Sequence, residues 1–217
     1  MSGLMIVNVL AALLVISSML VVLSKTAVGA AKLYAVQSLI LIGCFIALGF
    51  STGSTELFVW SGTAFLTKVI LVPAVLIYAF KKIGQTDSNY DQKITPVKFV
   101  ILAVVELALC FFVVQGINIP SAQNVYPALA VSLAHFFIGM TCIVTQKNIL
   151  KQILGYCLME NGSHLTLALL APQAPELVEI GVATDAVFAV IIMAILAVQI
   201  YRRYKSLDSG ELTELRG

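Results

Sequence analysis

The sequence predicts an all-α fold, a polytopic bundle of transmembrane helices. Hydrophobic residues make up 60% of the 217 positions and charged residues only 11%, whereas soluble domains carry about 25% charged residues. The apolar residues also come in blocks of about twenty, the length that a helix needs to cross a hydrocarbon core of ~30 Å. Together these observations exclude an ordinary soluble domain.

Seven blocks reach this length, and we expect each to be one span. Their approximate limits are Leu4–Leu23, Leu33–Phe50, Phe58–Phe80, Phe99–Gly116, Tyr126–Thr145, Ile149–Ala171 and Ile180–Ile200. Seven spans and six short connections use nearly the whole chain. We therefore expect a single membrane domain over residues 1–217, made of a three-helix portion with its cytoplasmic loop (1–98), a fourth span (99–125) and a second three-helix module (126–217).

Local features support individual spans. The first block lacks the basic residues that open a secretory signal sequence, so we interpret it as a retained span. In the third block Pro73 follows Lys68 by about one turn. Because proline removes a backbone hydrogen bond, it predicts an irregular helix near Lys68. Pro127 comes at the start of the fifth block, where proline fits the first turn of a helix.

The basic residues predict the orientation of the chain in the membrane. Twelve of the thirteen fall on alternate connections and on the tail: Lys25, Lys32, Lys81, Lys82, Lys93, Lys98, Lys147, Lys151, Arg202, Arg203, Lys205 and Arg216. The opposite connections carry only acidic side chains, Glu56, Glu176 and Glu179. Since basic loops stay in the cytoplasm, we expect the N-terminus outside and the C-terminus in the cytoplasm. The small net charge of +2 therefore reflects membrane topology, and we expect no nucleic-acid partner.

The cysteines do not indicate a metal site. Cys44, Cys110, Cys142 and Cys157 all fall inside predicted spans, without a CxxC or Cys/His spacing. We interpret them as packing residues, and we expect no iron–sulfur cluster, zinc ion or other cofactor.

Six ionisable residues fall inside predicted spans, and we treat all of them as candidates for a proton path. They are Lys68, Glu106, His135, Glu160, His164 and Asp185. A Lys, Arg or Asp that faces lipid at the centre of a helix costs roughly 2.5–3.5 kcal/mol. We therefore expect these side chains to face the protein interior, where they pair, become neutral or contact water.

The strongest candidates lie on the sixth span. Tyr156, Glu160, Ser163 and His164 are three or four residues apart, so they share one face of a helix, and Gln152 extends this face toward the cytoplasm. A polar stripe on an otherwise apolar helix is suited to a proton relay. We expect Glu160 to be the central proton site and His164 its relay partner.

Other interpretations stay open at this point. His135 alone can be a hydrogen-bonded packing residue, and Glu106 can serve only to pair with Lys68. A further alternative is a b-type haem anchor, in which His135 and His164 on adjacent spans ligate one iron. This alternative leaves the membrane carboxylates unexplained.

The C-terminal half resembles a known family. The segments that carry the resemblance to the second helix of subunit K, a small three-helix membrane subunit of complex I, are Lys147-Asn148-Ile-Leu, Ile153-Leu154-Gly155, Met159 with Asn161, and Ser163. The segment Ala183-Thr184-Asp185-Ala186 is similar to the third helix of that subunit, and the resemblance covers roughly Pro127–Gly217. The whole chain, with its segment Gly-Tyr-Cys-Leu-Met-Glu-Asn-Gly-Ser-His, resembles the component E family of hydrogenase-4, the second formate hydrogenlyase.

The resemblance implies a role without catalysis. It implies an integral subunit of the bacterial inner membrane, in the membrane arm of a group 4 [NiFe]-hydrogenase complex, beside antiporter-like and H-like membrane proteins. Subunit K carries two membrane carboxylates on a proton path. The third-helix carboxylate matches Asp185, whereas the second-helix position holds Cys157, and Glu160 follows one turn later, about 4.5 Å along the helix. The alternative is a passive scaffold that docks the other subunits.

Overall fold

The computed structural model describes residues 3–84, 94–117 and 124–212, and in this part every regular element is helical. The elements are α1 (Gly3–Leu23), α2 (Ala27–Thr52), α3 (Glu56–Ala64), the π-helix η1 (Phe65–Leu71), α4 (Val72–Ile83), α5 (Pro96–Gly116), α6 (Tyr126–Thr145), α7 (Ile149–Leu170), α8 (Glu176–Tyr204) and the short α9 (Ser209–Leu212). The predicted all-α class is confirmed. Lys93 and Arg216, two of the basic residues used to predict orientation, lie outside the described residues.

Six helical segments of the described chain are long and apolar enough to cross a membrane. They are α1, α2, the continuous segment Glu56–Ile83, α5, α6 and α8. Each coincides with one of the predicted spans. The helix α7 has 22 residues and matches the remaining prediction, but its polar side chains lower its hydropathy and it is not among the six.

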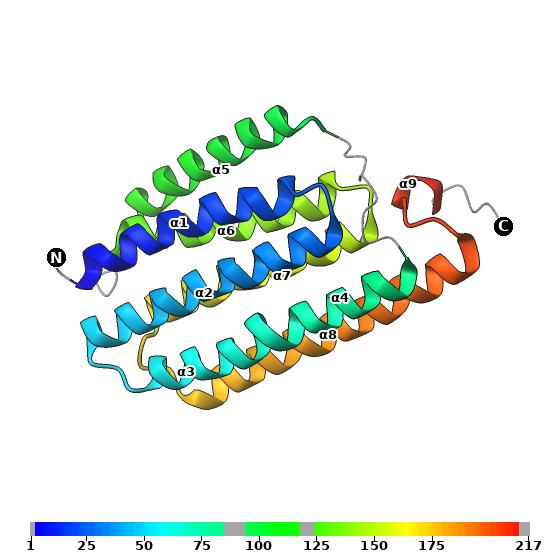
Figure 1. The fold of residues 1–217 in the computed structure, drawn as a ribbon. Helices are drawn as coiled ribbons and strands as arrows, with labels where there is room; N and C mark the ends of the chain where they lie inside the picture. Colours follow the sequence, from blue (N-terminus) through cyan, green and yellow to red (C-terminus); the bar gives the residue numbers. More distant parts are fainter. Residues whose placement is uncertain (1–2, 85–93, 118–123, 213–217) are drawn as a thin grey trace.

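The long helices run side by side in one bundle (Figure 1). One layer consists of α1, α2 and the α3–η1–α4 segment, and a second layer consists of α6, α7 and α8. Between the layers α1 packs on α6, α2 on α7 and α4 on α8, while α5 lies at the edge against α6. Two faces of α7 are therefore covered by neighbouring helices, so its polar side chains meet protein there.

Two glycines let α6 and α7 approach each other closely. A Cβ atom on Gly139 would lie 2.3 Å from the backbone nitrogen of Met159, and one on Gly162 would lie 2.4 Å from the backbone nitrogen of Phe136. Only hydrogen fits in these positions, as in the small-residue contacts of other membrane helices. This contact fixes the depth and rotation of α7, and with them the direction of Glu160.

Lys68 lies in the π-helix η1. The Val72 N–H donates to the Thr67 carbonyl, five residues earlier, and Pro73 has no N–H to continue the bonding. The irregular helix predicted near Pro73 is thus confirmed as a π-helical turn. Such turns frequently occur at functional sites, and in this one the Lys68 side chain points into the bundle and is buried.

The end of α1 is held by a lysine from α7. The Lys151 ammonium donates to the carbonyls of Val21, Val22 and Ser24 at 3.4, 3.1 and 2.5 Å. These are carbonyls that the end of a helix leaves without an intrahelical partner. Lys151 is buried, so it contributes to packing between the layers rather than to the charge of the surface.

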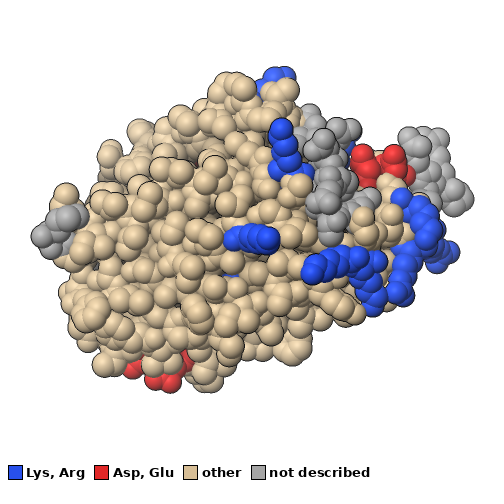
Figure 2. Space-filling model, in the orientation of Figure 1, with Lys and Arg blue, Asp and Glu red and all other residues tan. Residues whose placement is uncertain are grey.

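Lys and Arg side chains gather toward one end of the bundle, where α4 and α8 end (Figure 2). On the face shown in Figure 2 the opposite end carries acidic side chains near the starts of α3 and α8. Acidic side chains also appear at the basic end, near α9, so Figure 2 shows basic residues gathered at one end rather than a full separation of charge.

Candidate functional site

Lys68 and Glu160 form a buried ion pair between the two layers. The Lys68 ammonium donates to Glu160 Oε2 and, at 2.8 Å, to Asn161 Oδ1. The side chains of Lys68 and Glu160 are only 2% and 10% exposed. Removing an ion from water costs several kcal/mol. The carboxylate and the amide together therefore supply the partners that a charged Lys68 needs at this depth.

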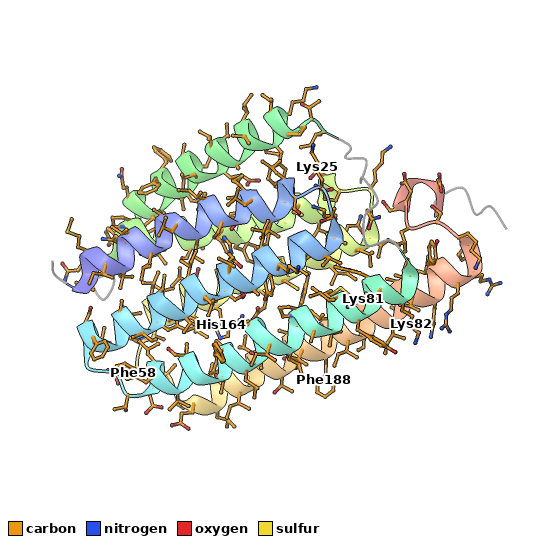
Figure 3. The ribbon with its side chains drawn as sticks, viewed as in Figure 1. Lys25, Phe58, Lys81, Lys82, His164 and Phe188 are labelled. Atoms are coloured by element: carbon orange, nitrogen blue, oxygen red, sulfur yellow. The ribbon has the colours of Figure 1, made fainter. Side chains whose placement is uncertain are left out.

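His164 lies inside the bundle (Figure 3), between two carboxylates. Its Nε2 is hydrogen-bonded to Glu179 Oε2, and its Nδ1 lies 3.2 Å from Glu160 Oε1. The second contact is within ion-pair distance but is not aligned as a hydrogen bond. The imidazole packs edge-on against Phe45, with ring centres 5.6 Å apart. An imidazole in this setting can take up a proton at one nitrogen and release one from the other.

Glu179 is the most deeply buried carboxylate of the group, with 0% exposure of its side chain. Besides the bond to His164, its Oε1 accepts a hydrogen bond of 3.0 Å from the Thr63 hydroxyl of α3. Glu179 lies in the first turn of α8, where the helix dipole stabilises negative charge. Both of its oxygens are thus satisfied by neighbouring helices.

His135 belongs to a second branch of polar contacts. Gln37 Nε2 lies 2.8 Å from His135 Nε2, and Ser18 Oγ lies 2.7 Å from His135 Nδ1. Because an amide nitrogen can only donate, Nε2 is the accepting atom and Nδ1 carries the proton. Ser18 Oγ accepts the hydrogen bond from Nδ1 and donates its own to the Leu14 carbonyl at 2.6 Å. His135 is therefore fully hydrogen-bonded as a neutral ring.

Asn161 connects this branch to the ion pair. Its Nδ2 donates to Gln37 Oε1 at 2.9 Å, while its Oδ1 accepts from Lys68. We call the connected set the buried polar chain; its members are Glu179, His164, Glu160, Lys68, Asn161, Gln37, His135 and Ser18. It crosses both layers and takes side chains from α1, α2, η1, α6, α7 and α8.

A small cavity adjoins the ion pair. It has a volume of about 10 Å³, which is about the space for one water molecule. Tyr34, Lys68, Tyr156 and Glu160 are among the residues that line it, together with apolar side chains of α8. Tyr156 interacts electrostatically with both Glu160 and Asp185, although Asp185 does not line the cavity.

The haem alternative does not fit this arrangement. Ser18 and Gln37 occupy both ring nitrogens of His135, and His164 faces a carboxylate at each nitrogen. The cavity beside the ion pair has room for about one water molecule and none for a porphyrin. Among the described residues no group of three or more His, Cys, Asp or Glu side chains could hold a metal ion. The four cysteines are buried and unpaired, in agreement with a packing role.

Asp185 is not where we expected it. It is exposed on the outer face of α8 and makes no hydrogen bond or ion pair with a described residue. Within this chain Asp185 therefore does not face the interior of the bundle, and its place on a proton path stays a prediction. The face of α8 that meets the bundle is a stripe of small residues, including Ala183, Ala186 and Val190, and position 185 lies off that stripe.

Glu106 and Ser163 also lie apart from the buried polar chain. Glu106 is half-buried on α5, where one carboxylate oxygen accepts from the Thr141 hydroxyl of α6. Lys68 pairs with Glu160, so the alternative in which Glu106 serves to pair with Lys68 does not fit the structure. Ser163 is exposed and only bonds back to its own helix, so the predicted stripe on α7 keeps Glu160 and His164 but not Ser163.

Sequence reasoning missed Glu179, which it assigned to an outer connection. The helix α8 begins at Glu176, three residues before it, and so brings Glu179 into the bundle. The spacing of the sequence could have indicated this position. Glu179 lies four residues before Ala183, so in a helix it falls on the same face as the small residues that meet the bundle. Gln37 and Asn161 were missed as site residues because uncharged amides are tolerated at many positions of a membrane helix.

Comparison with known proteins agrees with the resemblance seen in the sequence. Residues 127–217 match the family model for NADH-ubiquinone/plastoquinone oxidoreductase chain 4L. The chain is 50% identical to hydrogenase-4 component E of Escherichia coli over 219 aligned positions, which cover 100% of both chains. The protein of the same name from Shigella flexneri shows the same identity and coverage.

A more distant relative matches in part. An uncharacterized protein of Mycobacterium tuberculosis is 30% identical over 89 residues, 41% of this chain and 40% of that protein. No solved structure matches the chain. Since the identity to the Escherichia coli and Shigella proteins is high and spans both full lengths, the chain belongs to the hydrogenase-4 component E family.

Proposed function

We propose that this chain is a non-catalytic membrane subunit of a hydrogenase-4-type complex and that it conducts protons through the buried polar chain. The observation that carries the proposal is the sequence of titratable groups Glu179, His164, Glu160 and Lys68, in which each contacts the next inside the bundle. A helix bundle that only needed packing would be more stable with apolar residues of similar size in these places.

The proposal includes a topology of seven spans with the N-terminus outside. It is supported by the coincidence of six apolar helices with predicted spans and by the packing of α7 among them. The basic residues at one end of the bundle support a cytoplasmic location of the ends of α4 and α8. In this orientation Glu179 is close to the outer face, and Lys68 and Glu160 lie near the middle of the membrane.

Each member of the titratable group has a chemical role. Glu179 exchanges a proton with Nε2 of His164, and Nδ1 of His164 exchanges one with Glu160, so the imidazole passes a proton between two carboxylates. Lys68 pairs with Glu160 and controls its protonation, because a shift of the ammonium away from Glu160 favours the protonated acid. The branch formed by Gln37, His135 and Ser18 holds Asn161 in place, and Asn161 in turn positions Lys68.

One further carboxylate, Asp185, extends the proposed path, and a second, Glu106, lies apart from it. Asp185 on the outer face of α8 would contact a neighbouring subunit that packs there, and Tyr156, which lines the small cavity with Glu160, interacts electrostatically with both carboxylates. A carboxylate in this position suits an exchange of protons with a neighbouring membrane subunit. Glu106 on α5 is a separate and weaker candidate, because its hydrogen bond goes to Thr141 and not to a member of the buried polar chain.

The proposed partners are other membrane proteins, of the antiporter-like and H-like kinds, within a hetero-oligomer of the bacterial inner membrane. The name shared by the Escherichia coli and Shigella relatives, which contains "component", supports membership in a complex. The chain would supply no catalytic site of its own, and the oxidoreductase chemistry would belong to other subunits.

The decisive experiment replaces Glu160 by Gln in the assembled complex. Proton movement is measured with a pH-sensitive dye in inverted membrane vesicles while hydrogenase activity is measured in parallel. We expect loss of coupled proton movement with assembly retained, because the amide keeps the shape but cannot give up a proton. If instead Glu160→Gln and Asp185→Asn both leave proton movement intact and lower only assembly, the chain is a passive scaffold.

A further inference from the structure

The outer surface of the bundle contains an apolar groove between α4 and α8. The groove has a volume of about 680 Å³. Small side chains, Ala74 on α4 and Ala194 on α8, create the hollow, and Ile195 and Val198 add apolar walls. An exposed apolar groove between membrane helices is filled either by lipid or by another protein.

One end of this groove is basic. Lys82 on α4 and Arg202 on α8 both line it, and both come from the last turn of their helix. Figure 3 shows Lys82 at the end of α4, beside α8. Neither cation forms a salt bridge with a carboxylate in the described part of the chain. Two cations at the rim of an apolar groove fit a ligand with an anionic head and an apolar tail.

An aromatic residue lies at the same level as these cations. Tyr78 is 66% exposed, and the Lys82 ammonium lies 3.4 Å from its hydroxyl and 5.4 Å from the centre of its ring. Tyrosine is enriched where membrane helices meet lipid headgroups. Tyr78 therefore marks the depth at which the groove passes from the acyl region to the headgroup region.

The length of the groove matches one leaflet. Ala74 and Lys82 are eight helical steps apart, about 12 Å at 1.5 Å per step, and Ile191 and Arg202 are eleven steps apart, about 16 Å. Half of a hydrocarbon core is ~15 Å. The lining residues farthest from the cations are Ala74 on α4 and Ile191 on α8. The groove is thus open at the basic end and ends near mid-membrane.

We propose that this groove binds one anionic phospholipid of the cytoplasmic leaflet. Arg202 binds the phosphate through its planar guanidinium, Lys82 adds a second positive charge, and an acyl chain lies along Ala74 and Ala194. A helix of another subunit would cross both leaflets and would need a groove of about twice this length. The inference requires the helices to cross the membrane but does not depend on proton conduction.

The test measures lipid bound to the full-length purified chain. The protein is equilibrated with mixed micelles of phosphatidylglycerol and phosphatidylcholine, and retained lipid is counted by native mass spectrometry. The double variant Lys82→Gln/Arg202→Gln removes both groove cations. The matched control Lys81→Gln/Arg203→Gln removes the two neighbouring exposed cations, which do not line the groove.

We expect the wild-type chain and the control to retain phosphatidylglycerol in preference to phosphatidylcholine. The groove double variant should lose this preference by on the order of tenfold, since each cation near an anionic headgroup contributes to binding. Equal retention by the two double variants, or no preference in the wild type, overturns the proposal. If inorganic phosphate displaces the bound lipid as strongly as added phosphatidylglycerol does, the proposal is also overturned, because the site would then bind a free anion.

A second pair of variants tests the apolar part without changing charge. Ala74→Phe fills the groove, and Ala12→Phe adds the same ring at an exposed position of α1. We expect only the first to reduce bound lipid. In the assembled complex a photoreactive side chain at position 74 should form an adduct with the mass of a phospholipid. An adduct with another polypeptide instead means that a partner helix fills the groove, and overturns the proposal.

Discussion

His164 of α7 is bonded through Nε2 to Glu179 of α8, so that two residues separated by fifteen positions and a helix connection become one buried pair. Glu160 lies 3.2 Å from the other ring nitrogen. One imidazole therefore bridges a carboxylate in the first turn of α8 and a carboxylate between the two layers of the bundle. The predictions below follow from this bridge and from the packing that holds it.

The first prediction concerns Glu179. Replacing it by Gln keeps an acceptor for the Thr63 hydroxyl but removes the group that exchanges protons with His164. We expect coupled proton movement to fall at least tenfold in vesicles containing the assembled complex. Glu176→Gln is the control, because Glu176 is exposed in the same turn of α8. Similar losses in both variants would mean that the charge of this turn matters, not the bond to His164.

The second prediction concerns the ion pair. Lys68→Met leaves Glu160 buried without its cation, which typically costs 3–5 kcal/mol. The double variant Lys68→Met/Glu160→Gln removes both charges, so we expect it to recover most of that loss. Thermal unfolding of the purified chain in detergent measures both. If the double variant is no more stable than Lys68→Met alone, the two side chains do not depend on each other as an ion pair.

The third prediction concerns the contact between α6 and α7. Gly162→Ala places a methyl group against the backbone of Phe136, and overpacking of this kind costs about 1–3 kcal/mol. In Gly181→Ala the new methyl group meets nothing within 4 Å, so we expect stability to be unchanged or slightly higher. The melting temperatures of the two variants decide the matter, and equal values would show that the close approach is not required.

The fourth prediction concerns the support of α1. Lys151→Met removes three hydrogen bonds to carbonyls at the end of α1, and unsatisfied buried acceptors cost about 1–3 kcal/mol each. We expect a clear loss of stability with the ion pair between Lys68 and Glu160 intact. Lys25→Met, at an exposed position near the same helix end, serves as the control. Hydrogen exchange of the last turn of α1 should increase only in the first variant.

The fifth prediction separates the two outlying carboxylates. Asp185→Asn should reduce proton movement in the assembled complex, where a neighbouring subunit meets the outer face of α8, and leave the stability of the isolated chain unchanged. Glu106→Gln should have a smaller effect on proton movement than Glu160→Gln, because Glu106 is not connected to the buried polar chain. Vesicle assays of the three variants side by side provide the ranking, and a dominant effect of Glu106→Gln would contradict it.

The sequence by itself determined the class of the protein and the core of the candidate site. Block length and composition predicted the helical segments, because a membrane span needs about twenty apolar residues whatever it packs against. The cost of charge in lipid predicted that Lys68, Glu160, His164 and His135 lie inside the bundle, as they do. Pro73 predicted the irregular helix that became η1, because a missing N–H is a property of the residue alone.

Which of these groups contact one another depends on how the helices pack. Pairing depends on the rotation and depth of each helix, and these are set by contacts such as Gly162 on Phe136. Such contacts join Lys68 to Glu160 rather than to Glu106, bring Glu179 to His164, and turn Asp185 outward. A periodic pattern gives the face of one helix, but the neighbour that covers that face is a property of the packed bundle.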